Sequence, residues 1–502
     1  MTGSLLPLLV VVPLLGAALG ALVPGRLARV LLVLAPVATT AGGVALLVEH
    51  ARTPVLAHGV GGFVPGIAIP LVSDTLTAVM ITVTGLTTTA CIAFALVTGE
   101  ARLRFFPTLV MMLSAGVNGA LLTGDVFNLF VFIEVMLLPS YALVAMTGTW
   151  RRLGIGRLFV VVNLVTSTIL LVGIGLVYGV AGSVNMAVLS GVDADDPRFR
   201  LAVGVVLLAL AVKAGVVPLH GWLPRAYPAT SATVMALFSA LHTKVAIYAI
   251  FRIHQTVLDG ATSWMVPLLV LFGVTMLVGA YGSLGERMIR RSLAWQMIAG
   301  VGYILLGLAI GTQLGLAAGL FYMVHHILVM GSLLLSSGAI ERAYLTHQFV
   351  GLSGLMRREP LLAVVVALAM MSLVGFPPSS GFFGKVGIAR AAADLDGAWI
   401  WLVLGVLVVA SIGTLLAMTR VWADVFWGPP LEESPSRGKG HTDLPPVDAE
   451  TRMQTWSLAP AGALLLVSLA IFVVPGPLWE LCLQAADGLL DVTAYVEAVT
   501  AP

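Results

Sequence analysis

The chain has 502 residues, of which 59% are hydrophobic and only 10% are charged, and its mean hydropathy is +1.04. About a quarter of the residues of a soluble protein are charged, so this composition excludes a soluble globular protein and indicates a polytopic membrane protein. The net charge of +2 gives no reason to expect a nucleic-acid partner. Cys91 and Cys482 stand alone in apolar runs and predict neither a metal site nor a disulfide framework.

Apolar runs taken in chain order predict the membrane-spanning helices, each of which needs about 20 residues. They lie near 4–24, 28–48, 72–98, 105–123, 125–147, 157–180, 200–220, 230–252, 264–284, 292–311, 314–340, 360–390, 398–425 and 456–482. The first run has no basic residue before it and is long enough to span, so we interpret it as a helix and not as a signal peptide. The predicted fold class is an all-α integral membrane protein of about 14 helices, with residues 1–502 forming a single polytopic membrane domain.

The basic residues between these runs predict the topology. One set of alternate loops holds eighteen cations, namely Arg26, Arg29, Arg102, Arg104, Arg151, Arg152, Arg157, Arg225, Arg287, Arg290, Arg291, Arg342, Arg357, Arg358, Arg420, Arg437, Lys439 and Arg452. The other set holds five, namely Arg52, Arg198, Arg200, Arg252 and Arg390. The positive-inside rule then places the first set in the cytoplasm and both termini outside. A polar stretch rich in Pro, Gly and charge predicts a flexible cytoplasmic loop over about 428–455, before the last helix at about 456–482.

The cations that remain inside the predicted spans are all lysines: Lys213, Lys244 and Lys385. The chain has only one other lysine, Lys439, so its loops carry arginine almost exclusively. Arginine keeps its proton in nearly every environment, whereas a desolvated lysine can release it. Lysine in the membrane and arginine in the loops therefore favours side chains that titrate within the bilayer.

Other ionisable residues also fall within spans or at a break. Glu134 lies well inside the run FNLFVFIEVMLLPSYALVAM, whereas Asp74 and Asp125 lie near the outer ends of their spans. The histidines of this kind are His220, His242, His325 and His326. Each charge at mid-bilayer costs about 2.5–3.5 kcal/mol, so three lysines and a glutamate would cost on the order of 10 kcal/mol if they were unpaired. Such residues mark ion paths and proton relays.

Structural interpretations of the same residues stay open. A lysine can extend its amine to the membrane surface, above all near a helix end. Glu134 could bond a neighbouring helix, and His325 and His326 could bridge two helices. Trp222 and the methionines fit packing better than chemistry.

Two spans carry helix-breaking sequences beside a lysine. KAGVVPLHGWLPRAYP, which begins at Lys213, contains Pro218 and Pro224, and GFPPSSGFFGK, which ends at Lys385, contains two further prolines. Carbonyls freed at membrane depth are tolerated only inside protein or along a water-filled cavity. Lysine precedes the first break and follows the second, which suggests inverted repeats over about 105–255 and 265–427. Broken helices at corresponding positions of two repeats indicate a transport site.

Five stretches together give a resemblance that covers nearly the whole chain. GDVFNLFVFIEVMLLPSYAL, KAGVVPLHGWLPRAYP, LHTKVAIYAIFRI, FPPSSGFFGK and RVWADVFWG occur in this order. They resemble the antiporter-like membrane subunits that respiratory complex I, membrane hydrogenases and Mrp-type multisubunit Na+/H+ antiporters share, and most closely the D-type Mrp subunits. The resemblance implies fourteen helices in two inverted five-helix repeats, with the seventh and twelfth helices broken.

The resemblance also implies roles for individual residues. The family's fifth-helix glutamate falls on Glu134, and its lysines of the seventh, eighth and twelfth helices fall on Lys213, Lys244 and Lys385. Its central eleventh-helix histidine best matches His326. In the family the glutamate–lysine pair tunes the proton affinity of the lysine, and protons step along a central polar axis. We therefore expect Glu134 and Lys213 to lie within ion-pair reach.

The chain departs from the family pattern at three places. Met330 occupies a position where relatives commonly carry a lysine, and this leaves the route from His326 to Lys385 open. Arg225 replaces an aspartate in the turn after the first break, and RMIRRSLAWQ lacks the acidic residue that usually precedes its basic pair.

The expected function is a proton-translocating subunit of a multisubunit Na+ (cation)/H+ antiporter, a secondary transporter and not an enzyme. It would lie in the bacterial cell membrane beside other subunits, including a homologous antiporter-like one. No Walker, haem or iron–sulfur motif is present, so no cofactor is implied. The alternatives are a redox-driven subunit of complex I or a hydrogenase, a stand-alone solute transporter, and a structural subunit without conduction.

Overall fold

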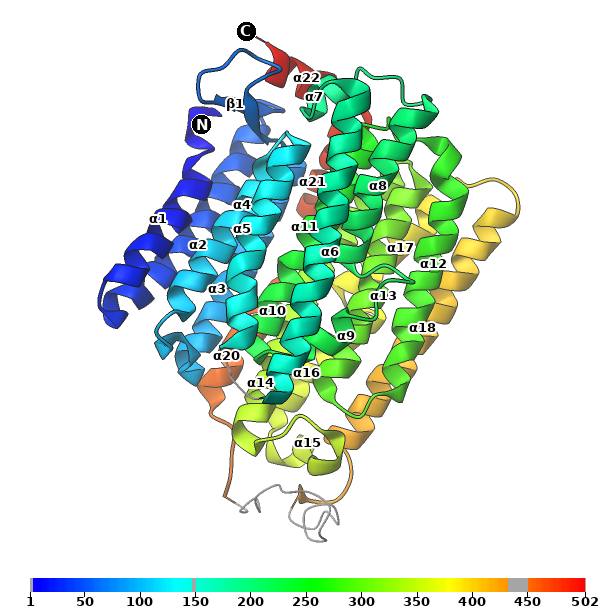
Figure 1. Ribbon diagram of the computed structural model, residues 1–502. Helices are drawn as coiled ribbons and strands as arrows, with labels where there is room; N and C mark the ends of the chain where they lie inside the picture. The colour runs from blue at the N-terminus through cyan, green and yellow to red at the C-terminus, as the bar shows by residue number, and fades with distance from the viewer. Residues whose placement is uncertain (1–2, 147–149, 432–449, 502) are drawn as a thin grey trace.

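The structure is a computed structural model that describes residues 3–146, 150–431 and 450–501. It is a bundle of long helices that run roughly alongside one another (Figure 1). In chain order the helices are α1 (Leu8–Leu22), α2 (Gly25–His50), α3 (Thr75–Thr98), α4 (Phe106–Leu122), α5 (Val126–Ala145), α6 (Trp150–Ala181), α7 (Met186–Leu189), α8 (Pro197–Ala214), α9 (Leu223–Ala226), α10 (Ala232–Ala240), α11 (His242–Thr256), α12 (Met265–Gly282), α13 (Ile289–Ile310), α14 (Gln313–Tyr344), α15 (Leu355–Arg358), α16 (Pro360–Val374), α17 (Ser380–Ala392), α18 (Ala398–Val425), α20 (Ala459–Val473), α21 (Gly476–Leu490) and α22 (Thr493–Thr500). Two strands, β1 (Leu56–Val60) and β2 (Ile69–Ser73), pair antiparallel with Leu56 opposite Ser73.

The predicted fold class is confirmed. Within the described ranges, eleven helices are long and apolar enough to cross a membrane, and α10 with α11 counts as one of them. Three further passes are α4, α8 with the segment after it, and α16 continued by α17, so the bundle has the expected fourteen. The last pass differs from the prediction, because it consists of α20 and α21 and reaches Leu490.

The two ends of the bundle differ. The hairpin β1–β2, α7 and α22 lie at one end, which we call the terminal face because both chain ends lie there (Figure 1). The short helix α15 lies at the opposite end, which we call the loop face (Figure 1). Most of the predicted cytoplasmic loop, residues 432–449, is outside the described residues.

Three passes form the centre of the bundle. In the most apolar 18-residue stretch of each helix, the share of buried residues is 100% for α14 and for α10–α11 and 94% for α13. The same share is only 33% for α2 and α18. Polar residues within these apolar stretches of α11, α13 and α14 are therefore enclosed by other helices and do not face lipid. Side chains on these helices can carry charge only where another residue or water compensates it.

Both predicted breaks are present and begin in the same way. Gly215 ends α8 with φ 85°, and Gly375 ends α16 with φ 90°, a left-handed conformation that glycine adopts without a steric penalty. After each glycine the next N–H, of Val216 or Phe376, bonds a carbonyl of the last helical turn at 3.0 Å. This is the Schellman arrangement that commonly ends a helix. The predicted inverted repeats, 105–255 and 265–427, stay a prediction.

Candidate functional site

Buried polar side chains form a row through the middle of the bundle, and its first group lies where α5, α6 and α8 meet. Lys213 is 2% exposed, and its Nζ donates to Asn163 Oδ1 on α6 at 3.1 Å. Ser167, one helical turn further along α6, donates its hydroxyl to Glu134 on α5. Because residues four apart lie on one face of a helix, α6 presents both partners side by side.

Glu134 and Lys213 make no direct hydrogen bond to one another in the described part of the chain, and that they lie within ion-pair reach stays a prediction. The two charges attract one another, but each is bonded to α6. The physical reason is that Asn163 and Ser167 supply hydrogen bonds to both residues without bringing the amine onto the carboxylate. A separated pair lets the proton content of Lys213 respond to Glu134 and to other charges that approach.

His242 joins this group from the start of α11. Its Nε2 lies 2.8 Å from the Ser140 hydroxyl on α5, and its ring packs 4.6 Å from the ring of Phe238. The Ser140 hydroxyl donates to the Met136 carbonyl at 2.7 Å, so its oxygen is free to accept. The His242 Nε2–H then donates to Ser140, so the neutral imidazole carries its hydrogen on Nε2.

The centre of the row is formed by Lys244 on α11 and His326 on α14. Both side chains are 0% exposed. Lys244 Nζ bonds Thr243 Oγ1 at 3.3 Å, and neither ring nitrogen of His326 has a hydrogen-bond partner among the described residues. A buried polar group without a partner is rare and calls for a functional explanation or an ordered water. Gly300 on α13 makes room for the ring, since a Cβ there would lie 1.9 Å from His326 Nε2.

His325 connects the centre to the second broken span. Its Nδ1 lies 2.8 Å from the Ser380 hydroxyl on α17, which in turn lies 2.7 Å from the Ser468 hydroxyl on α20. Tyr322, one turn earlier on α14, packs its ring 5.1 Å from His325 and 6.2 Å from His326. The last pass of the bundle therefore takes part in this group.

Lys385 ends the row and is held only by neutral groups. Its Nζ donates to the Val374 carbonyl at 2.8 Å, to Ser411 Oγ at 3.0 Å and to the Tyr303 hydroxyl at 3.2 Å. It also lies 4.3 Å from the centre of the Tyr303 ring, which itself packs 5.0 Å from Tyr322. Two tyrosines thus connect the histidines to Lys385, whereas the family resemblance leads us to expect a lysine at the position of Met330.

His220 does not join this row. It lies between α8 and α9 with its ring 5.4 Å from Trp295, and it lines a cavity of about 610 Å³ with Arg225 and Glu286. The other seven predicted site residues lie in the row, which extends from α5 to α17.

Two buried arginines correct the expectation that lysines alone occupy the spans. Arg252 on α11 is 3% exposed and pairs with Asp74 at 2.6 Å, and Arg290 on α13 is 1% exposed and pairs with Glu341 at 2.9 Å. The sequence predicts a loop position for each arginine because each lies at the edge of its apolar run. A carboxylate on another helix makes each burial possible. Arg252 lies about two helical turns after Lys244 in the same uninterrupted run, HTKVAIYAIFRI. This continuity is the one sequence signal that could have placed Arg252 inside the span.

Sequence reasoning also misses the neutral partners. Asn163, Ser167, Tyr303 and Ser411 contact the charged residues of the row, yet single amides and hydroxyls are common in membrane helices. The one available signal is the spacing of Asn163 and Ser167 within an apolar run.

Comparison with known proteins gives consistent matches. Residues 123–413, more than half of the chain, match the family described as NADH:quinone oxidoreductase/Mrp antiporter, transmembrane. The D subunit of the Na+/H+ antiporter of Alkalihalophilus pseudofirmus is 34% identical over 441 residues, which are 86% of this chain and 85% of that protein. A chain of the Mrp complex from Dietzia sp. DQ12-45-1b is 42% identical with a TM-score of 0.93, and 100% of each chain is covered. A chain of the membrane-bound sulfane sulfur reductase, an archaeal respiratory membrane complex, is 27% identical with a TM-score of 0.85 and 99% coverage of each.

Proposed function

Because the chain belongs to the NADH:quinone oxidoreductase/Mrp antiporter family of membrane subunits, we propose that it moves protons within a multisubunit Na+/H+ antiporter. The observation that carries this proposal is the row of buried titratable side chains between α5 and α17. Such residues inside a membrane protein mark ion and proton paths. Packing alone does not explain the row, because replacing buried charged residues by hydrophobic ones of similar volume is often neutral or stabilising.

In the proposed mechanism, protons pass between neighbouring lysines and histidines of the row. Lys213 holds its proton beside Glu134. A proton that reaches Lys244 repels the charge on Lys213 and favours its release. His326, with both ring nitrogens free, exchanges a proton with Lys244, and Tyr322 and Tyr303 continue the route to Lys385. Each charge that crosses the membrane field is worth about 2.3 kcal/mol per 100 mV, which is the energy available to move a cation uphill.

The assembly and orientation are part of the proposal. The terminal face would be outside and the loop face in the cytoplasm of a bacterial cell, as the distribution of arginines predicts. A homologous antiporter-like subunit would lie beside this chain. Co-purification of hydrophilic redox subunits in place of antiporter subunits would instead favour a redox-driven complex.

Exchange of Lys244 for alanine and for arginine tests the proposal. Alanine removes the charge and the proton site, whereas arginine keeps the charge and hardly ever releases its proton. If Lys244 is a relay, both variants lose Na+-dependent pH change in everted vesicles that carry the whole complex. Assembly is checked by co-purification, and Arg420→Ala, which changes a half-exposed cation on α18, serves as the control. Near wild-type exchange in Lys244→Arg would remove Lys244 from the proton path.

A further inference from the structure

A second set of polar residues leads away from the row toward the terminal face. Lys244, Tyr248 and Arg252 are spaced four residues apart on α11 and therefore lie along one face of that helix. The Tyr248 hydroxyl donates to the Leu121 carbonyl at 2.7 Å and lies 2.8 Å from the Thr77 hydroxyl. These contacts fix Tyr248 between the central lysine and Arg252.

Arg252 closes the end of this set. Its Nη2 lies 2.6 Å from Asp74 Oδ2 and 3.4 Å from both the Tyr248 and the Thr77 hydroxyl. The rings of Tyr248 and Tyr495 flank the guanidinium at 5.6 and 5.2 Å. Arg252 is therefore held from several sides in one position.

Asp74 fixes the charge of the pair. It precedes α3 and caps it, accepting the Thr77 N–H at 2.9 Å. Burial raises the pKa of Asp74, but the Arg252 guanidinium and the Thr77 N–H outweigh this and hold the pKa below its ordinary value. The carboxylate thus stays ionised near neutral pH and is one of several groups that hold the guanidinium, together with Thr77, Tyr248 and Tyr495.

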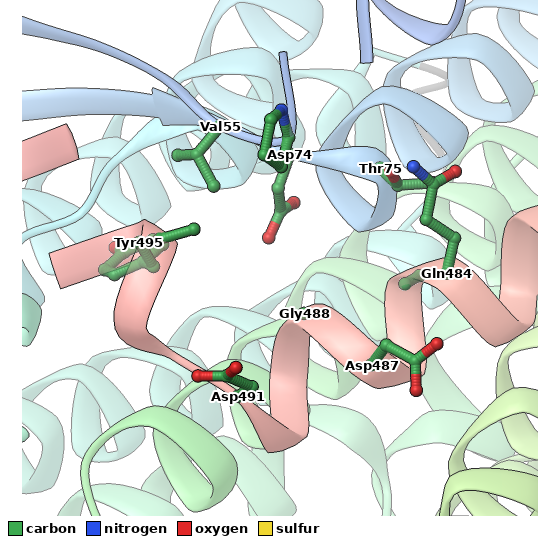
Figure 2. A pocket seen from close by; sticks show the side chains of 11 residues that line it. Val55, Asp74, Thr75, Gln484, Asp487, Gly488, Asp491 and Tyr495 are labelled. Atoms are coloured by element: carbon green, nitrogen blue, oxygen red, sulfur yellow. The ribbon is translucent and has the colours of Figure 1, made fainter. Parts of the chain in front are cut away.

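The other side of Asp74 faces a cavity of about 250 Å³ at the terminal face. Figure 2 shows Asp74 beside this space, with Tyr495 and Asp491 on one side and Gln484 and Asp487 on the other. The two other carboxylates of the cavity, Asp487 and Asp491, attract cations from solution. Along the face of α11 that carries Lys244, Tyr248 and the Arg252–Asp74 pair lie between Lys244 and this cavity.

We propose that this set connects Lys244 to the terminal face, and that Arg252 keeps this connection closed to protons and cations. A guanidinium does not release its proton, so it cannot relay one, and its fixed charge repels cations. The role of Lys244 at the inner end rests on the proposed function, but closure by Arg252 does not. While it is closed, this connection would prevent protons from leaking between the acidic cavity and the row.

Removal of both charges tests the closure without leaving one of them buried and unpaired. The double variant Arg252→Met/Asp74→Asn should let an imposed pH gradient decay several-fold faster than wild type in Na+-free vesicles that carry the complex. Asp74→Asn alone retains Arg252 and should stay tight. Adding Tyr248→Phe to the double variant removes the hydroxyl and should slow the decay again.

The same variants can overturn the proposal. Wild-type decay in the assembled double variant would make the pair purely structural, and rapid decay in Asp74→Asn alone would remove Arg252 as the barrier. The decay requires no Na+ exchange, so loss of the proposed function at Lys244 leaves this result interpretable.

A measurement in the native background decides the question if the double variant does not assemble. Ala494→Cys lines the cavity, whereas Thr77→Cys lies behind the ion pair. A membrane-impermeant cationic thiol reagent added to the terminal face should modify Ala494→Cys and leave Thr77→Cys unmodified. Equal rates at both positions would contradict closure.

Discussion

The two broken spans use the same backbone arrangement but different side-chain donors at the end of the helix. At the first break, the Trp222 indole N–H donates at 3.1 Å to the Val212 carbonyl, which also accepts the Gly215 N–H at 3.1 Å. At the second, the amine of Lys385 itself donates to the Val374 carbonyl at 2.8 Å. A neutral ring thus adds a donor at the first break, and a lysine of the row supplies the donor at the second.

This difference changes what surrounds each lysine. Lys213 donates a hydrogen bond to Asn163 and feels the charge of Glu134 nearby. Lys385 makes three hydrogen bonds to neutral oxygens and has no acidic partner among the described residues. The comparison teaches that two similar breaks can serve one lysine that responds to an acid and another that also holds the backbone together.

The strongest test of this comparison is alanine at each lysine. Both Lys213→Ala and Lys385→Ala should abolish Na+-dependent exchange, because each removes a proton site. Lys385→Ala should lower the free energy of unfolding further than Lys213→Ala, by about 1–3 kcal/mol, because it removes three hydrogen bonds, including the donor of the buried Val374 carbonyl, whereas Lys213→Ala removes one, to Asn163. Thermal unfolding of the purified complexes measures the difference. Equal stability of the two variants would contradict the division of roles.

A smaller loss is expected at Gly300, beside the centre of the row. Alanine there places a methyl group on the His326 ring, so the ring or α13 must shift. Overpacking of this kind costs about 1–3 kcal/mol, and a displaced ring should reduce exchange strongly. Gly175→Ala on α6 is the matched control, since a Cβ at Gly175 meets no atom within 4 Å. Exchange is measured in everted vesicles. Normal exchange in Gly300→Ala would exclude His326 as a link in the row between Lys244 and Lys385.

The smallest effect is expected from Trp222→Phe. Phenylalanine keeps the packing against Phe159 but cannot donate to Val212, so about 1 kcal/mol of stability should be lost. Exchange should persist, because Lys213 keeps Asn163 and Glu134. The melting temperature of the complex and its exchange rate are measured together. Loss of exchange without loss of stability would mean that Trp222 acts on Lys213 directly.

The passes, both breaks and most of the row were predictable because their signals are local. An apolar run long enough to span, a proline beside a glycine and a lysine in an apolar run are all read from a few neighbouring residues. Rotation of the helices is not local. The sequence could not indicate that Asn163 and Ser167 on α6 would bond Lys213 and Glu134.

Long-range pairing explains the remaining misses. Arg252 and Arg290 looked like loop residues because their carboxylates, Asp74 and Glu341, are distant in sequence. Tyr303 and Ser411 become partners of Lys385 only when α13 and α18 pack against α17. Packing decides which ordinary polar residues acquire a role.

The scarcity of lysine gives this chain a built-in chemical reporter. Lys213, Lys244 and Lys385 are three of its four lysines, so nearly all of its amine chemistry lies in the row. A small amine-reactive reagent that travels with water would modify these positions only while water reaches them. Peptide mass spectrometry after brief exposure could then record, residue by residue and without any mutation, when each part of the interior becomes wet during turnover.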